Sequence, residues 1–253
     1  MTNRLRRLVR DKALALIDHV VSDYHRKQVA ELHQLRTDLR ELEHRIRRDL
    51  AFAADREAAL ESTRFALQHM PTARRLPDAT ATLEYGLSLA PAGGMALEFG
   101  VYSGSTLKVI ANARGGELVY GFDSFQGLPE NWRSGFPAGT FSTDGLPDVP
   151  GAELVVGLFA DTLPGFLAEH QGPVSFLHVD CDLYSSTVTV LEHAGPRLRA
   201  GSIVVFDEYF NYPGWREHEY RAWQEYTTER GLAFTYEGYA ADNEQVVVRI
   251  TTS

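Results

Sequence analysis

Short apolar segments alternate with helical segments between residues 95 and 208, and this alternation constrains the fold more than any other feature of the chain. The intervening stretches, such as SGSTLKVIANA and DTLPGFLAEH, have the patterning of helices. Strands joined by crossover helices form a parallel sheet that is covered on both faces. The sequence therefore predicts an α/β fold with a mostly parallel sheet, whose strands are MALEFG (95–100), LVYGFD (118–123), AELVVG (152–157), VSFLHVD (174–180) and GSIVVFDE (201–208).

The two ends of the chain carry different patterns. Residues 233–250 form two β-rich runs around a polar turn, which predicts an antiparallel hairpin closing the edge of the sheet. Residues 4–56 contain neither Pro nor Gly, which indicates a long helix. Because Pro and Gly are concentrated in residues 71–94, we expect a helical arm over 1–70 and a second domain over 71–253.

Apolar residues of the arm fall into two stripes. The second stripe has the spacing of a coiled-coil seam: Leu32, Leu35, Leu39, Leu42 and Ile46. One straight helix would be about 80 Å long, so a single bend or break is expected near Tyr24–Gln28, where the stripes lose phase. The stripes would pack on the protein's own body or on a second copy. We expect the second, a homodimer or higher homo-oligomer.

Charge and composition exclude several classes of protein. The net charge is −9, and residues 1–56 hold 13 Lys and Arg against 9 Asp and Glu, so the rest of the chain is strongly acidic. An acidic body repels phosphates, so no nucleic-acid partner is expected. No membrane span or signal peptide is expected either, because long apolar runs are absent from the sequence. A single cysteine fits a cytoplasmic protein.

The turn after the first strand has the residues of a cofactor site. In LEFGVYSGST, Gly100 and Gly104 allow close backbone approach, and Ser103 and Ser105 open the following helix. Tyr102 stands where the dinucleotide fingerprint requires glycine. The segment therefore suits a ligand with an amino acid end, whose carboxylate would lie at the turn and whose ammonium group would meet Glu98.

The second strand ends in an acid of its own. GFDSF places Asp123, followed by Ser124, where a carboxylate can accept both hydroxyls of a ribose. Together with Glu98 and the Gly-Ser turn, Asp123 indicates S-adenosylmethionine as the cofactor. A structural turn beside a surface acid is the alternative.

Carboxylates also follow the fourth and fifth strands. Asp180 ends one strand, and Asp207 and Glu208 end the next. Since these strands are expected to be neighbours, the like charges would repel unless a cation lies between them. Oxygen ligands favour Mg²⁺, with Mn²⁺ or Ca²⁺ as alternatives. The alternative interpretation is that these carboxylates face water without a metal, and that Asp182 caps a helix.

A loop of unusual length separates the second and third strands. Residues 124–151 are rich in Gly and Pro and contain Phe125, Trp132, Phe136 and Phe141. Loops of this length are usually functional or disordered. Because of the aromatic residues, we expect a lid that covers the substrate.

Four segments in order, LEFGVYSGST, GFDSFQGLPE, FLHVDCDLYSST and VVFDEYFNYPGW, resemble the macrocin/mycinamicin O-methyltransferase family of antibiotic-tailoring enzymes. The resemblance covers about residues 95–250 and leaves out the arm. It implies a Rossmann-like class I methyltransferase fold with a seven-stranded sheet, S-adenosylmethionine, Mg²⁺, and methylation of a sugar hydroxyl on a glycosylated natural product.

The family's site residues are carried over by motif. Metal ligands are implied at Asp180, Asp207 and Glu208. VGLFADTL would supply the adenine wall. The cofactor is expected to meet Glu98, Gly100, Tyr102, Ser103, Ser105, Asp123, Ser124, Phe159, Asp161 and Asp180.

A more distant similarity concerns the general base. Catechol and caffeoyl-CoA O-methyltransferases have a lysine three positions after the metal-binding aspartate, where this chain has Leu183. The lysine mechanism is therefore not carried over, and Asp182 is the preferred base, followed by His218. The acceptor is expected to be a small molecule with a sugar hydroxyl. The alternative acceptor is a phenolic or catechol hydroxyl. The second alternative is that the protein is not an enzyme but an assembly protein that works through its arm.

Overall fold

The computed structural model describes the backbone of residues 2–252 and the side chains of residues 5–252. Its contacts divide the chain into two units, one up to Ala54 and one from Asp55 onward. The second unit is built on an eight-stranded sheet in the order β1-β7-β8-β6-β5-β2-β3-β4. The strands are β1 (Arg74–Leu76), β2 (Met95–Phe99), β3 (Val119–Asp123), β4 (Glu153–Val156), β5 (Val174–Val179), β6 (Leu198–Phe206), β7 (Ala233–Ala240) and β8 (Val246–Thr252).

The predicted α/β sheet is confirmed, with two corrections. Only β8 runs antiparallel to its neighbours, β6 and β7, and every other pair is parallel. The sheet has eight strands rather than seven because the three residues of β1 pair with β7. So short a strand, with both arginines exposed, shows no period-two pattern. The hairpin therefore does not close the sheet, since β1 lies outside it.

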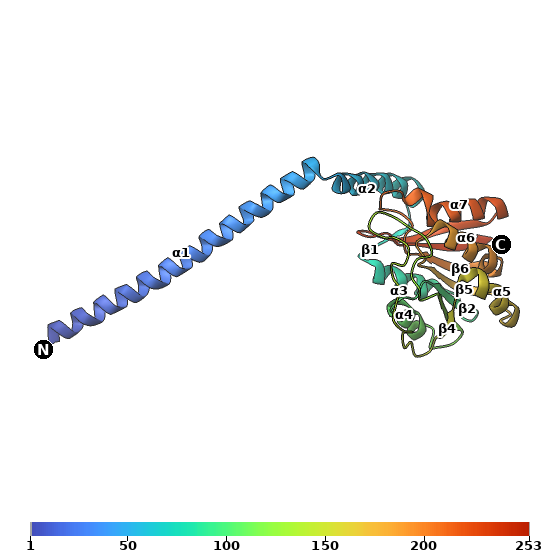
Figure 1. The fold of residues 1–253 in the computed structure, drawn as a ribbon, viewed down its shortest axis with the longest axis horizontal. Helices are drawn as coiled ribbons and strands as arrows, with labels where there is room; N and C mark the ends of the chain where they lie inside the picture. Colours follow the sequence, from blue (N-terminus) through green and yellow to red (C-terminus); the bar gives the residue numbers. More distant parts are fainter. Residues whose placement is uncertain (1, 253) are drawn as a thin grey trace. The chain divides into compact units, whose positions relative to one another are not determined.

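Helices cover the two faces of the sheet, as Figure 1 shows. One layer is α3 (Ala79–Leu89) and α4 (Ser105–Ala113). The other is α5 (Phe159–Glu169), α6 (Tyr184–Ala194), α7 (Glu219–Arg230) and the part of α2 (Leu50–His69) that follows Ala54. Two short 3-10 helices, η1 (Gly195–Arg197) and η2 (Trp215–Glu217), complete the elements. Ala96 and Leu97 are fully buried on opposite faces, so both sides of β2 face a core.

The aromatic residues after β6 belong to one of these cores. Phe65 of α2 packs edge-on against Trp215, with ring centres 5.4 Å apart. Tyr209 and Trp215 are both buried. These residues therefore anchor the loop after β6 in the domain core.

Helix α1 (Thr2–Arg48) is continuous over 47 residues, so the expected break near Tyr24–Gln28 is wrong. A change of apolar phase does not interrupt backbone hydrogen bonds, and Asp23 pairs with Lys27 at 3.2 Å across this segment. The helix ends instead before Asp49, whose carboxylate accepts the N–H of Ala51 at 3.0 Å and caps α2. None of the described helices has the length and apolar character that crossing a membrane requires.

Candidate functional site

A cavity of about 540 Å³ opens where β2, β3 and β5 end. Nine of the residues expected at the site line it: Gly100, Tyr102, Ser105, Asp123, Ser124, Phe159, Asp180, Asp182 and Glu208. Five others lie outside the lining: Glu98, Ser103, Asp161, Asp207 and His218. The topology therefore brings most of the expected residues to one place.

The turn after β2 approaches β5 closely. Gly100 has φ +94, and a Cβ atom there would overlap the carbonyl oxygen of Asp180. Gly104 precedes α4 with φ +75, where a Cβ atom would meet Val149 at 2.6 Å. Only glycine fits both the conformation and the space at Gly100. Gly100 and Asp180, which approach each other here, both line the cavity.

Asp123 holds this turn through backbone hydrogen bonds. One carboxylate oxygen accepts the N–H of Val101 at 2.9 Å and of Tyr102 at 2.8 Å. The other oxygen accepts the N–H of Phe125 at 2.7 Å. Carboxylate oxygens accept more than one hydrogen bond, so Asp123 can still receive a ligand hydroxyl.

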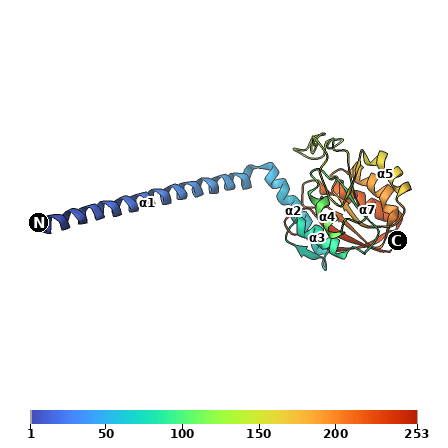
Figure 2. The ribbon, with the colours of Figure 1, turned by 90° about the horizontal axis from the view of Figure 1, so that it is seen from below.

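The segment 124–151 is irregular, as the yellow-green chain of Figure 2 shows. Its residues supply much of the cavity wall, including aromatic side chains. Phe141 packs against Tyr102 of the first turn, with ring centres 5.7 Å apart. Ser185 of α6 donates to Glu130 of the segment at 2.6 Å. The lining residues from this segment are Ser124, Gly127, Leu128, Pro129, Trp132, Arg133, Phe136 and Phe141.

An acidic cluster occupies the ends of β5 and β6, which are neighbours as expected. Asp180, Asp207 and Glu208 each offer a carboxylate oxygen, and these oxygens lie within 4.8 Å of one another. Burial and the charge of Asp207 raise the pKa of Asp180 and of Glu208 well above the ordinary values. One oxygen of Glu208 is buried without a hydrogen-bond partner among the described residues. The oxygen set and the unpartnered oxygen both fit a divalent cation.

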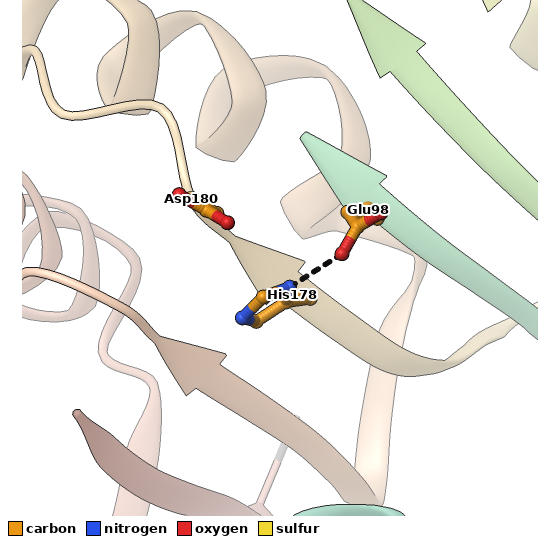
Figure 3. A group of neighbouring side chains, drawn as sticks. All are labelled: Glu98, His178 and Asp180. Atoms are coloured by element: carbon orange, nitrogen blue, oxygen red, sulfur yellow. Dashed lines mark hydrogen bonds and ion pairs between the residues drawn. The ribbon is translucent and has the colours of Figure 1, made fainter. Parts of the chain in front are cut away.

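Glu98 lies behind this cluster rather than in the cavity wall. It is fully buried and contacts His178 Nδ1 at 2.9 Å, as Figure 3 shows. The other ring nitrogen of His178 lies 3.8 Å from Asp207. Burial by itself would lower the pKa of His178, but Asp207 and Glu98 raise it well above the ordinary value. From the sequence, Glu98 was expected to meet the ammonium group of the cofactor. In the structure its partner is the imidazole of His178 on the neighbouring strand, β5.

The two expected bases differ in position. Asp182 lines the cavity in a left-handed conformation, with φ 63, which Asp adopts more readily than most residues. Burial raises the pKa of Asp182 to about 7, although the charge of Arg133 opposes this. His218 lies outside the lining, with its ring centre 6.4 Å from Trp132. Burial lowers the pKa of His218. Of these two residues, only Asp182 lies in the cavity wall.

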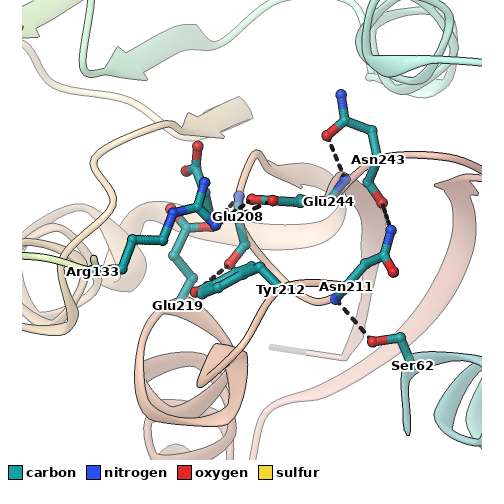
Figure 4. A network of polar contacts seen from close by, with 8 residues as sticks. All are labelled: Ser62, Arg133, Glu208, Asn211, Tyr212, Glu219, Asn243 and Glu244. Atoms are coloured by element: carbon teal, nitrogen blue, oxygen red, sulfur yellow. Dashed lines mark hydrogen bonds and ion pairs between the residues drawn. The ribbon is translucent and has the colours of Figure 1, made fainter. Parts of the chain in front are cut away.

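The sequence did not indicate three charged residues in or near the cavity: Arg133, Glu219 and Glu244. Glu219 is fully buried, and its carboxylate accepts the N–H of Glu208 at 3.0 Å. Arg133 pairs with Glu244 of the turn between β7 and β8. Figure 4 shows this network around Glu208. Charged residues in polar segments predict exposed side chains, so only the tertiary arrangement reveals these contacts.

Residues 97–209, which include the cavity's turn and its acidic cluster, match the family model described as a methyltransferase domain. This part of the chain is therefore similar to a methyltransferase domain. The matched segment runs from β2 to the loop after β6. It includes the strand ends at which the cavity lies.

Two curated proteins are similar to parts of the chain. It is 30% identical over 46% of its length to a tetracenomycin-C rhamnosyl 4'-O-methyltransferase of Streptomyces olivaceus, covering 53% of that protein. It is 40% identical over 32% of its length to the mycinamicin III 3''-O-methyltransferase of Micromonospora griseorubida, covering 31%. The chain thus spans about half or less of the curated relatives it matches.

A solved structure extends the similarity beyond those segments. The crystal structure of a calicheamicin methyltransferase superposes with a TM-score of 0.54 at 28% identity, covering 66% of the present chain and 75% of that chain. The resemblance to macrocin/mycinamicin O-methyltransferases and the Rossmann-like methyltransferase fold are therefore confirmed.

Proposed function

We propose that the protein is an S-adenosylmethionine-dependent and divalent-metal-dependent O-methyltransferase that acts on a sugar hydroxyl of a glycosylated natural product in antibiotic or related biosynthesis. The observation that carries the proposal is one cavity whose wall joins the Gly100 turn and Asp123 to two of the three clustered carboxylates, Asp180 and Glu208. The acceptor class is supported by the names of the curated relatives, which are O-methyltransferases of a rhamnosyl tetracenomycin and of mycinamicin III. The proposed place of action is the cytoplasm.

The cofactor would lie along the turn from Gly100 to Ser105, with its ribose at Asp123 and its adenine near Phe159. Asp123→Ala removes acceptors for three backbone N–H groups as well as the ribose contact. We expect it to weaken S-adenosylhomocysteine binding by about 10- to 100-fold, because each lost hydrogen bond to a charged group costs about 1.5–3 kcal/mol. Isothermal titration calorimetry measures this. Unchanged affinity would contradict the proposed cofactor site.

The metal would be held by Asp180, Asp207 and Glu208, with Mg²⁺ as the first candidate and Mn²⁺ or Ca²⁺ as alternatives. When bound, such an ion stabilises negative charge on a hydroxyl oxygen that is losing its proton. Glu219 fixes the backbone of Glu208, and His178 faces Asp207 from behind. The first contact holds the backbone at Glu208, and the second places a ring nitrogen beside the carboxylate of Asp207.

Asp182 is the proposed general base. Its carboxylate lines the cavity beside Asp180 and would accept the proton of the acceptor hydroxyl, while the surrounding wall excludes water from the methyl group. Asp182→Asn keeps the size of the side chain and removes its basicity. We expect kcat to fall about 10²-fold with unchanged cofactor affinity, within the range of general base catalysis. Retained kcat in this variant would show that another group takes the proton.

Methyl transfer itself tests the proposed function. Labelled S-adenosylmethionine would be supplied with a panel of glycosides and, separately, catechols, each in Mg²⁺ and in EDTA. The proposal expects label in the glycosides, only with metal. Transfer to catechols alone would support the phenolic alternative, and full activity in EDTA would remove the metal from the proposal.

We propose that helix α1 joins two or more copies of the protein. Its seam residues are 47% to 66% exposed, although burying an aliphatic side chain contributes about 1.5–3 kcal/mol. Since α2 contributes Phe65 to the domain core, the informative truncation begins at Asp55 and leaves that core whole. Light scattering should give an oligomer for the full chain and a smaller species for the truncated one. If the full and the truncated chain form particles with the same number of copies, the arm does not have the proposed role.

A further inference from the structure

The guanidinium group of Arg133 is held in one orientation in the wall of the cavity. Its Nη1 donates to both carboxylate oxygens of Glu244, at 3.1 and 3.2 Å (Figure 4). The guanidinium carbon lies 3.9 Å from the ring centre of Trp132 and 4.6 Å from that of Tyr212. The pair with Glu244 and the two aromatic contacts restrict rotation of this flat group.

Both residues of the pair are attached to fixed backbone. The carbonyl of Arg133 accepts the N–H of Phe136 at 2.9 Å, and the N–H of Trp132 donates to the carbonyl of Phe136 at 3.0 Å. On the other side, the carbonyl of Glu244 accepts the N–H of Tyr209 at 3.1 Å, and Tyr209 is buried. The position of the guanidinium group is therefore set by the protein before any acceptor binds.

Most of the hydrogen-bond donors of Arg133 remain available. A guanidinium group carries five N–H groups in one plane. Nε and Nη2 make no hydrogen bond to any described residue, since only Nη1 is bonded, to Glu244. Of the described residues that line the cavity, Arg133 is the only Lys, Arg or His, and its side chain is 25% exposed. The cavity wall therefore presents fixed, charged N–H donors.

These donors lie on the side of the cavity away from the proposed ribose contact. Glu244 precedes β8, whose first residue pairs with the end of β6. Asp123 ends β3, and β5 and β2 lie between β6 and β3 in the sheet. Burial raises the pKa of Asp182 to about 7, and the charge of Arg133 opposes this, so the guanidinium group acts on the proposed base. An acceptor hydroxyl at Asp182 would therefore have Arg133 nearby.

We propose that Arg133 binds the acceptor and donates from Nε and Nη2 to a second hydroxyl of the sugar that is methylated. The inference rests on the proposed function and adds an acceptor-binding residue to it. Hydrogen bonds from a charged donor are stronger than those from a neutral one. A site built to bind a hydroxyl in this way also discriminates against an analogue that lacks it. Arg133 is therefore a specificity-determining residue that selects the sugar by a hydroxyl other than the reacting one.

The experiment combines Arg133→Gln with a change in the acceptor. The probes are the glycoside with the highest kcat/KM in the methyl-transfer panel and analogues of it, each lacking one further hydroxyl of the methylated sugar. With the parent glycoside, Arg133→Gln should lower kcat/KM by about 10- to 100-fold, as expected for a hydrogen bond to a charged group. With the analogue that lacks the bound hydroxyl, wild type and variant should have nearly equal kcat/KM. Calorimetry should give the variant an unchanged affinity for S-adenosylhomocysteine.

Arg249→Gln is the matched control. Arg249 pairs with Glu237 at 3.0 Å, and these side chains are 30% and 24% exposed, but neither lines the cavity. Its kcat/KM ratios between parent and analogues should equal those of the wild type. The inference is overturned if Arg133→Gln slows the parent and every analogue by the same factor, because the arginine then only holds the segment 124–151 in place, or if it slows none of them. If the wild type methylates no glycoside, the proposed function itself fails, and this inference fails with it.

Discussion

Asp207→Ala is expected to lower kcat by about 10³-fold, because several kcal/mol of charge stabilisation at the reacting oxygen would be lost with the metal. Asp207 contributes one of the three clustered oxygens and faces His178. The variant removes a proposed metal ligand and leaves the Gly100 turn and Asp123 untouched. Mg²⁺ binding measured by calorimetry should therefore disappear, while S-adenosylhomocysteine affinity stays at the wild-type value.

Two comparisons make this result interpretable. Glu192→Ala removes an exposed carboxylate from α6 and should leave both Mg²⁺ binding and turnover unchanged. EDTA should bring the wild-type enzyme down to the kcat of Asp207→Ala, and added Mg²⁺ should restore only the wild type. If Asp207→Ala binds Mg²⁺ normally, the three carboxylates are not the metal site.

Gly100→Ala is expected to destabilise the fold by about 3–5 kcal/mol, which is among the largest effects of single substitutions. The added Cβ atom would overlap the carbonyl oxygen of Asp180, and φ is +94 at this position. Neither backbone segment can retreat freely, because Gly100 directly follows β2 and Asp180 directly follows β5. The N–H of Gly100 donates to the carbonyl of Phe122 and the N–H of Asp180 to that of Phe99, each at 2.9 Å. Chemical denaturation measures the free energy of unfolding.

Gly93→Ala is the matched control for this prediction. Gly93 also has a positive φ, +75, but an added Cβ atom there has no neighbour within 4 Å. Only the backbone conformation is then unfavourable, which costs about 1–2 kcal/mol. Similar losses in the two variants would show that the contact between Gly100 and Asp180 can relax, and that the base of the cavity is not as tight as the structure indicates.

The positions of the strand-end acids could be predicted because they depend only on chain order and sheet topology. Asp180 and Asp207 follow consecutive strands joined by a helix, and such strands are commonly neighbours in a parallel sheet. Their meeting point at the carboxyl ends then follows without any knowledge of side-chain packing. The same reasoning places Gly100 and Asp123 at that edge of the sheet.

Partners of the buried charged groups could not be predicted in this way. Glu98 and His178 are opposite each other in the register of β2 and β5, and sequence fixes neither the register nor the side-chain direction. Glu219 belongs to α7, whose start must lie beneath Glu208 before the two can meet. In the arm, the loss of apolar phase near Tyr24 suggested a break, but backbone hydrogen bonding continues to Arg48.

Cys181, which stands between Asp180 and Asp182, has a practical consequence. It is the chain's one cysteine, and it is buried with its sulfur 3.6 Å from the hydroxyl of Thr187. Burial raises the pKa of the Cys181 thiol well above its usual range. Because maleimides and similar reagents react with the thiolate, the native protein should be nearly inert to them. Cysteines introduced on helix α1 can therefore carry fluorescent or spin labels without first replacing a residue of the catalytic cavity.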